Sequence, residues 1–295
     1  MSLQKLYTTT NGFASNCANT FISFLKILLS STFRIHLPKA KQNSCIVLGN
    51  GPSLRQSLLK CPELFRQHAL ICVNHFALSK EYSELQPGYY VMLDPGLWEK
   101  DREDSKKLFE IIIERTTWEL QLLLPQKAKN AVAIKHLERS NPNIKINYFN
   151  YTVFRGFPKT AHFFYSSNLA MPQSQNVLVA TLFLAINMHF KKIILVGADH
   201  TWHENLHINE SNQLCLKDVH FYENESKVNY RLFYKDLGQK ETFTMHEILF
   251  TFSKVFYGYQ LLKRYADFSG TTIYNASEVS FIDAFERKKM QEFAP

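Results

Sequence analysis

The feature that most constrains the fold is the stretch at residues 45–54, which reads Cys-Ile-Val-Leu-Gly-Asn-Gly-Pro-Ser-Leu. Four apolar residues that run directly into two glycines predict a buried strand ending in a tight turn. Glycine lets a backbone approach a ligand closely, and Pro52 and Ser53 suit the first turn of a following helix. The N–H groups of such a turn can hold an anion, so the segment predicts a nucleotide site.

The same stretch is an incomplete dinucleotide fingerprint. Gly49 and Gly51 match the first two glycines of G-x-G-x-x-G, but Leu54 stands at the third position, and the Lys-Ser/Thr ending of a P-loop is absent. A turn that only redirects the chain is therefore the structural alternative.

Composition narrows the class of protein. A chain of 295 residues predicts one large domain, with or without an appendage. The 34 Lys and Arg against 26 Asp and Glu give a formal charge of +8, which favours a phosphate-bearing ligand, an anionic membrane surface or nucleic acid. No Arg-rich stripe or nucleic-acid motif is present, so nucleic acid is not expected as a partner. A homo-oligomer remains open.

The five cysteines have no C-x-x-C spacing, and two of them lie in apolar runs. This pattern is typical of reduced core residues in a cytoplasmic protein.

Residues 1–43 are interpreted as a helical extension that precedes a catalytic domain at 44–295. The apolar run at 13–37 is interrupted by Asn16, Asn19 and Lys26, so it is too polar and short to span a membrane, and it lacks the pattern of a signal peptide. Two interpretations fit it equally. It is a basic amphipathic segment at the cytoplasmic face of the inner membrane, or a helix that packs on the domain.

The rest of the chain alternates between short apolar runs and helical stretches, which predicts an α/β fold with a mainly parallel sheet flanked by helices. Strands are expected at 45–48, 69–73, 89–93, 131–134, 144–149, 193–196 and 271–274, and helices at 104–124, 174–190 and 245–268. Asn50, Asn74, Asp94 and Asp199 follow apolar strands. Open α/β sheets bind ligands at that edge.

Residues 201–238 are rich in His, Asn, Glu and Tyr, and we interpret them as a lid in preference to a disordered loop. His200, His203 and His207 have spacings that a zinc ion can use, although solvated lid histidines are the favoured interpretation. His220 lies beside aromatic residues and two carboxylates, so it is a candidate general base, with a surface histidine as the alternative. No G-x-S-x-G elbow appears, which disfavours covalent hydrolase chemistry.

Five blocks, at 46–54, 72–76, 93–96, 190–199 and 219–222, resemble the bacterial sialyltransferases of glycosyltransferase family 42 in the same order. They equally resemble the 6-hydroxymethylpterin diphosphokinase-like (DUF115) superfamily, which includes nonulosonate transferases. The resemblance covers residues 44–285. It implies a Rossmann-like, GT-A-like single domain with a lid, which transfers a sialic acid or related sugar from a CMP-activated donor to a surface glycan such as lipopolysaccharide or capsule, with inversion and without a metal or other cofactor.

The resemblance also implies the roles of individual residues. His220 matches the general base of the family's His-Tyr motif, Asp94 stands where the family has a donor-binding asparagine, and Ser174 or Asn176 lies over the donor. The implied nucleotide- and donor-binding residues are Gly49, Asn50, Gly51, Pro52, Ser53, Asn74, Asp94, Ser174, Gln175, Asn176, Gly197, Asp199, Thr201 and Tyr222.

Three differences from glycosyltransferase family 42 bear on which sugar donor the chain binds. The family's Arg-Ile-Thr-Ser-Gly block reads Met-Pro-Gln-Ser-Gln-Asn at 171–176, with no arginine, and its phosphate-binding tyrosine is replaced by Thr201. The lid and the first forty residues are also unlike the family. Lys217, Lys227 and Arg231 are candidates to bind a donor carboxylate. A magnesium-dependent pterin-type diphosphokinase and a non-catalytic nucleotide-binding protein remain as alternatives.

Overall fold

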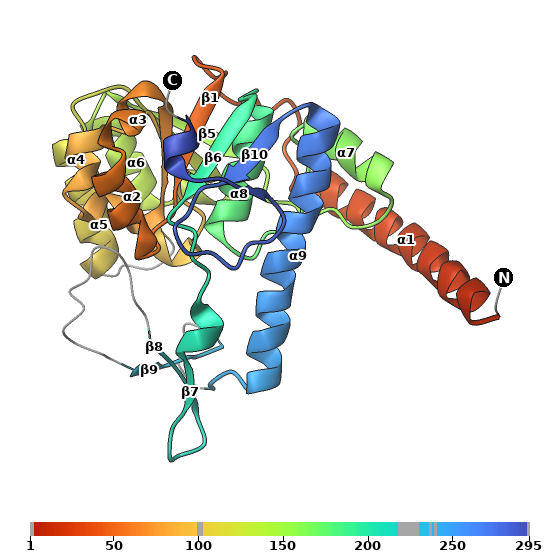
Figure 1. Ribbon diagram of the computed structural model, residues 1–295. Coiled ribbons are helices and arrows are strands. Elements are labelled where there is room, and N and C mark those ends of the chain that lie inside the picture. The colour runs from red at the N-terminus through yellow and green to blue at the C-terminus, as the bar shows by residue number, and fades with distance from the viewer. Residues whose placement is uncertain (1–2, 99–102, 218–229, 236–237, 239–240, 294–295) are drawn as a thin grey trace.

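The computed structural model describes residues 3–98, 103–217, 230–235, 238 and 241–293. Its centre is an eight-stranded sheet in the order β11-β10-β6-β1-β2-β3-β4-β5, and all neighbouring strands are parallel (Figure 1). The strands are β1 (Ser44–Leu48), β2 (Ala69–Val73), β3 (Tyr89–Val91), β4 (Leu120–Pro125), β5 (Ile144–Phe149), β6 (Lys192–Val196), β10 (Thr272–Asn275) and β11 (Glu286–Arg287). The predicted α/β, Rossmann-like fold is confirmed.

The chain changes direction across the sheet at β1. From β1 it winds outward through β2, β3 and β4 to β5, and it then returns to place β6 on the other side of β1. The gap between the carboxyl ends of β1 and β6 is therefore the topological switch point, where open α/β sheets form their binding crevice.

Helices cover both faces of the sheet because the strand residues alternate between two cores. Cys45 and Val47 join a core built with α1 (Leu3–Ser30), α7 (Pro158–Ser166), α8 (Val177–Asn187) and α9 (Met245–Ser269). Ile46 and Leu48 join the opposite core with α2 (Ser53–Lys60), α3 (Pro62–Gln67), α4 (Glu81–Leu85), α5 (Glu103–Arg115) and α6 (Val132–Ser140).

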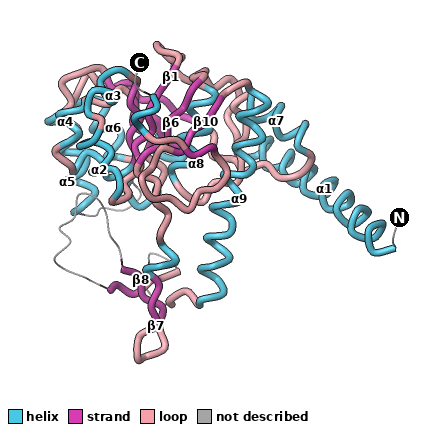
Figure 2. Tube along the Cα trace, viewed as in Figure 1, coloured by secondary structure: helices cyan, strands magenta, loops and turns pink. Residues whose placement is uncertain are grey.

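The predicted lid contains a second sheet. β7 (Leu206–Ile208), β8 (Leu214–Lys217) and β9 (Tyr230–Leu232) pair antiparallel, and they lie apart from the large sheet, near the start of α9 (Figure 2). Asn209 closes the turn between β7 and β8, because its side chain accepts from the Gln213 backbone N–H at 2.9 Å. The described part of the lid is thus ordered around a hairpin.

Two segments differ from the sequence prediction. Residues 131–134, expected as a strand, begin α6, where Ile134 and Leu137 are buried three residues apart on one helix face. The helix expected over 104–124 ends at Arg115 and is followed by β4. Leu122, Leu123 and Leu124 are all buried because β4 is covered on both faces, so the run has no alternation to distinguish it from a helix.

Candidate functional site

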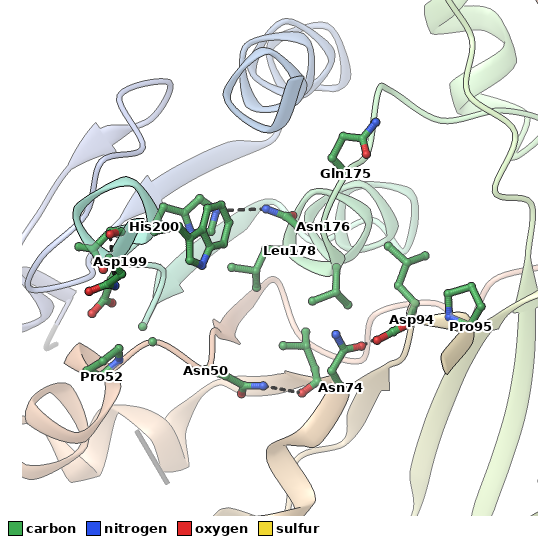
Figure 3. A pocket seen from close by; sticks show the side chains of 18 of the residues that line it. Asn50, Pro52, Asn74, Asp94, Pro95, Gln175, Asn176, Leu178, Asp199 and His200 are labelled. Carbon is green, nitrogen blue, oxygen red and sulfur yellow. Dashed lines mark hydrogen bonds between the residues drawn. The ribbon is translucent and has the colours of Figure 1, made fainter. Parts of the chain in front are cut away.

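A pocket of about 480 Å³ opens at the switch point. Its walls come from the loops that follow β1, β2, β3 and β6, and from the N-terminus of α8 (Figure 3). The predicted site residues that line it are Asn50, Gly51, Pro52, Asn74, Asp94, Gln175, Asn176, Gly197, Asp199 and Thr201.

Some predicted residues lie elsewhere. Gly49, Ser53 and Ser174 are beside the pocket and support its walls. His220 and Tyr222 lie outside the described residues, and so does Lys227.

The glycines of the turn allow the loops after β1 and β6 to contact each other closely. The N–H of Gly49 donates to the Val196 carbonyl and that of Gly51 to the Gly197 carbonyl, both at 2.8 Å. A Cβ on Gly51 would lie 2.5 Å from Asp199 Oδ1 and 2.6 Å from the Gly197 oxygen. Gly197 has a φ of 63°, a conformation that suits glycine. The motif therefore joins β1 to β6.

The anion seat predicted at the start of α2 holds a carboxylate of the protein itself. Asp199 accepts from the backbone N–H of Ser53 at 3.0 Å and from its hydroxyl at 2.5 Å. A negative charge is stabilised at a helix N-terminus. Burial nevertheless raises the pKa of Asp199, with the two Ser53 hydrogen bonds opposing the rise. A ligand phosphate would reach the Ser53 N–H only by displacing this side chain.

Asn50 and Asn74 connect the strand ends. Asn50 donates from Nδ2 to the Val73 carbonyl at 3.1 Å, while its Oδ1 is buried without a hydrogen-bond partner among the described residues. Asn74 has a φ of 45°, and its Oδ1 accepts from the Leu93 N–H at 3.2 Å. These bonds hold the loops after β1, β2 and β3 in one wall.

Asp94 lies at the mouth of the pocket. It is exposed, and its Oδ1 accepts from the Gly96 N–H at 2.9 Å, which caps the short helix η2 (Pro95–Leu97). Figure 3 places Asp94 on the opposite side of the pocket from Asp199.

A buried hydrogen-bond network forms the wall of the pocket at the start of α8 and the loop after β6. Asn176 caps α8 by accepting from the Val179 N–H at 2.9 Å, and its Nδ2 points at His200 Nε2, 3.1 Å away (Figure 3). Tyr259 of α9 places its hydroxyl 2.7 Å from the same nitrogen. Because the Nδ2 atom of Asn176 can only donate, the Nε2 atom of His200 is the acceptor, and the neutral ring carries its proton on Nδ1.

His200 is neutral and fixed. Burial lowers its pKa to about 3, and its ring stacks on Trp202 with centroids 4.2 Å apart. Trp202 in turn lies 5.5 Å from the ring of Phe252 on α9. His200 therefore positions α8, the loop after β6 and α9 relative to one another, and it is a poor general base.

The three histidines whose spacing a zinc ion could use have separate neighbours, and His200 is buried, so the favoured interpretation of solvated histidines is wrong for that residue. His200 packs in the network above, His203 lies edge-on to Phe281, and His207 contacts Tyr230. Over the described ranges of the chain, no three His, Cys, Asp or Glu side chains gather as metal ligands.

The 171–176 loop, which has no arginine of its own, is contacted by Arg155. Arg155 donates through Nε to Gln173 Oε1 at 3.0 Å, and through its terminal nitrogen to the same oxygen. It does not line the pocket. None of the described residues that do line it is a lysine or arginine, so the charged lining side chains in this part of the chain are Asp94 and Asp199.

Tyr151, Leu178 and Asn205 line the pocket and were missed from the sequence. Tyr151 donates to the Ser174 carbonyl at 2.7 Å, which orders the loop before α8. Only its place just after the predicted strand at 144–149 signals such a role, because that strand ends at the same edge of the sheet.

Comparison with known proteins places the chain in a family. The model of 6-hydroxymethylpterin diphosphokinase MptE-like proteins matches residues 18–205, which is more than half of the chain. The chain belongs to this family. The match includes the loops after β1, β2, β3 and β6 and ends before His220. The superfamily part of the resemblance is thus confirmed, whereas the sialyltransferase part stays a prediction.

The MAf glycosyltransferase from Magnetospirillum magneticum AMB-1 is a solved structure similar to this family member. The TM-score is 0.50 at 12% sequence identity, over 90% of this chain and 36% of that one. The chain thus spans only about a third of that protein, and at this identity the likeness shows the fold. No curated protein matches the sequence.

Proposed function

We propose that the protein is an inverting glycosyltransferase that transfers a sialic acid or related nonulosonate from a CMP-activated donor to a hydroxyl of a cell-surface glycan. The observation that carries this proposal is the pocket at the β1–β6 switch point, lined by amide and carboxyl side chains from successive strand ends. The fold shared with a glycosyltransferase structure is compatible with it. The five free cysteines support a cytoplasmic site of reaction.

The donor nucleotide is assigned to the wall made by Asn50 and Asn74. The unpartnered Oδ1 of Asn50 suits a hydrogen-bond donor such as a base amino group or a ribose hydroxyl. The donor phosphate is assigned to the opposite wall, near the N-terminus of α8, where the helix dipole favours negative charge.

The chemical step is a direct displacement. His220 takes the proton of the acceptor hydroxyl while the oxygen forms a bond to the anomeric carbon of the donor. The bond from that carbon to the phosphate oxygen breaks, and CMP leaves with the electron pair. One displacement inverts the anomeric centre. The role of His220 rests on the sequence resemblance. His200 is not chosen as the base because its Nε2 atom is already hydrogen-bonded and burial lowers the pKa of its ring.

The test combines binding and transfer. CMP and CMP-sugars are expected to raise the melting temperature, by an amount that grows with the logarithm of the ratio of ligand concentration to Kd, and NAD is not. His220→Ala should keep CMP binding and lose transfer by a factor of about 10²–10⁴. His246→Ala, an exposed histidine on α9, is the matched control. No stabilisation by any cytidine nucleotide, together with full transfer by the His220 variant, would overturn the proposal.

A second candidate is the magnesium-dependent diphosphokinase reaction for which the family is named. It is favoured by one observation, that Asp94 and Asp199 line a pocket with no described lysine or arginine. Bound triphosphate would then need a cation, and carboxylates are ligands that magnesium prefers. ATP consumption that depends on magnesium and on a pterin alcohol, without CMP binding, would favour this candidate. Tight nucleotide binding without turnover would favour a non-catalytic protein.

A further inference from the structure

Helix α1 packs on the domain with a side that carries hydroxyl groups and a few apolar residues. It extends from the body past α7 to the N-terminus (Figure 1). Ser23 donates to the Arg155 carbonyl at 3.0 Å and accepts from the Arg155 N–H at 2.9 Å, and Thr20 accepts from the Phe157 N–H at 3.1 Å. Ile27 is the apolar residue of α1 buried in the core. Phe13 and Phe24 also contact the domain, with ring centroids 5.5 Å from Phe157 and 6.3 Å from Phe164. The helix is therefore held to the domain by hydroxyl groups together with these few apolar contacts.

The side of α1 that faces away from the domain is apolar. Phe21, Leu25 and Leu28 recur at helical spacing and are 63%, 41% and 52% exposed. Ile22 and Leu29 flank them and are also exposed. An amphipathic helix of a globular protein normally turns its apolar stripe to the core. Here a stripe of apolar side chains faces away from the core, and a contiguous exposed apolar surface of this kind marks a binding face.

The charge around this helix is of one sign. No aspartate or glutamate precedes Glu63 in the chain. Lys26, Arg34 and Lys39 are exposed on and just after α1. Their aliphatic stems can lie along an apolar layer while their charges stay in water. Two copies of this helix face to face would bring two segments of like charge together, whereas an anionic surface complements them.

We propose that α1 binds an anionic lipid bilayer, with its apolar side in the headgroup region and its axis along the surface. The domain packs on the opposite side of the helix, so this orientation leaves the domain in water. Burial of the apolar side chains and attraction of the basic residues by anionic lipids act together in such binding.

Sedimentation of the full chain with lipid vesicles tests the proposal. Vesicles of phosphatidylcholine with phosphatidylglycerol are expected to bind the chain, with weaker binding at high salt and on pure phosphatidylcholine. Phe21→Asn with Leu25→Asn and Leu28→Asn should lower the partition coefficient at least about tenfold. Leu59→Asn, on α2 and 77% exposed, should leave it unchanged.

A second measurement separates loss of binding from loss of folding. Phe21→Trp is expected to shift the tryptophan emission to shorter wavelength on anionic vesicles, and the triple variant should keep the wild-type melting temperature because the three side chains are exposed. The proposal is overturned if the chain stays in the supernatant, if the triple variant binds as well as the wild type, or if the triple substitution instead abolishes a dimer seen by analytical ultracentrifugation without lipid.

Discussion

The carboxylate of Asp199, three residues after β6, receives both the backbone N–H and the hydroxyl of Ser53 at the start of α2. The two residues are 146 positions apart in the chain. This contact closes the switch point of the sheet, so the turn after β1 and the loop after β6 form one structural unit. The start of α2, which the sequence predicts as a seat for a ligand anion, is thus occupied by the carboxylate of Asp199.

Replacing the Asp199 carboxylate by an amide is therefore expected to destabilise the fold, because one hydrogen-bond acceptor for Ser53 is lost. Asp199→Asn keeps the shape but turns one acceptor into an amide donor that faces Ser53, and we expect a loss of about 1–3 kcal/mol in the free energy of unfolding. Ser53→Ala retains the backbone bond and should cost less, about 1 kcal/mol. Urea unfolding measures both. Wild-type stability of the asparagine variant would show that the contact contributes nothing.

Gly51 is expected to tolerate no side chain. In Gly51→Ala the new Cβ would lie 2.5 Å from Asp199 Oδ1, so the loops after β1 and β6 must separate, at a cost of about 1–3 kcal/mol. Gly88→Ala is the matched control, because a Cβ there meets no atom within 4 Å. Thermal unfolding of the two variants checks this, and equal melting temperatures would contradict the close approach.

His200 is expected to make stability fall in mild acid. Its pKa is lowered from 6.5 to about 3 by burial, so below pH 6.5 the unfolded chain binds a proton that the folded chain does not. Stability from this group is fully present above pH 6.5 and is lost as the pH falls toward 3, with a slope of up to about 1.4 kcal/mol per pH unit. Asp199, whose pKa is raised by burial, acts in the opposite sense, because its protonated form is favoured in the folded chain.

The measurement is urea unfolding of the wild type and of His200→Gln between pH 7.5 and 5.5, so that the effect of the other titrating groups cancels in the comparison. His200→Gln keeps hydrogen-bonding capacity and cannot take up the proton. The difference in stability between wild type and this variant should shrink as the pH falls, and a constant difference would refute the assignment.

Asn176 is expected to matter for both stability and nucleotide binding. Asn176→Ala removes the cap of α8 and the bond to His200, for a loss of about 1–2 kcal/mol, and should weaken CMP binding several-fold because α8 forms a pocket wall. Thr244→Ala removes the cap of α9, away from the pocket, at a similar cost in stability. Calorimetric titration with CMP distinguishes the two variants, since Thr244→Ala should bind CMP as the wild type does.

Much of the fold can be predicted from the local pattern of apolar and polar residues. The strands over residues 69–73 and 144–149 were predicted at their observed bounds, and those at 45–48 and 193–196 within a residue, because buried parallel strands are short apolar runs that end at polar turns. The error at 131–134 has a local cause. Four apolar residues are too few to separate period 2 from period 3.6, and only the burial of Ile134 and Leu137 reveals the helix.

The site was predictable where it follows strand ends and not where it depends on packing. Asn50, Asn74, Asp94 and Asp199 are brought together because parallel strands end at one edge. Tyr151 was missed because nothing in its neighbours indicates that its hydroxyl reaches the Ser174 carbonyl.

The sequence by itself determined the parallel sheet, the polar residues at its carboxyl edge and the tight glycine turn, since these depend on residues close together in the chain. The tertiary structure alone decided what that turn holds. Asp199 occupies the start of α2, His200 is buried against Tyr259, and α1 turns its apolar side outward. Each of these depends on contacts between segments distant in sequence, for which local periodicity carries no signal.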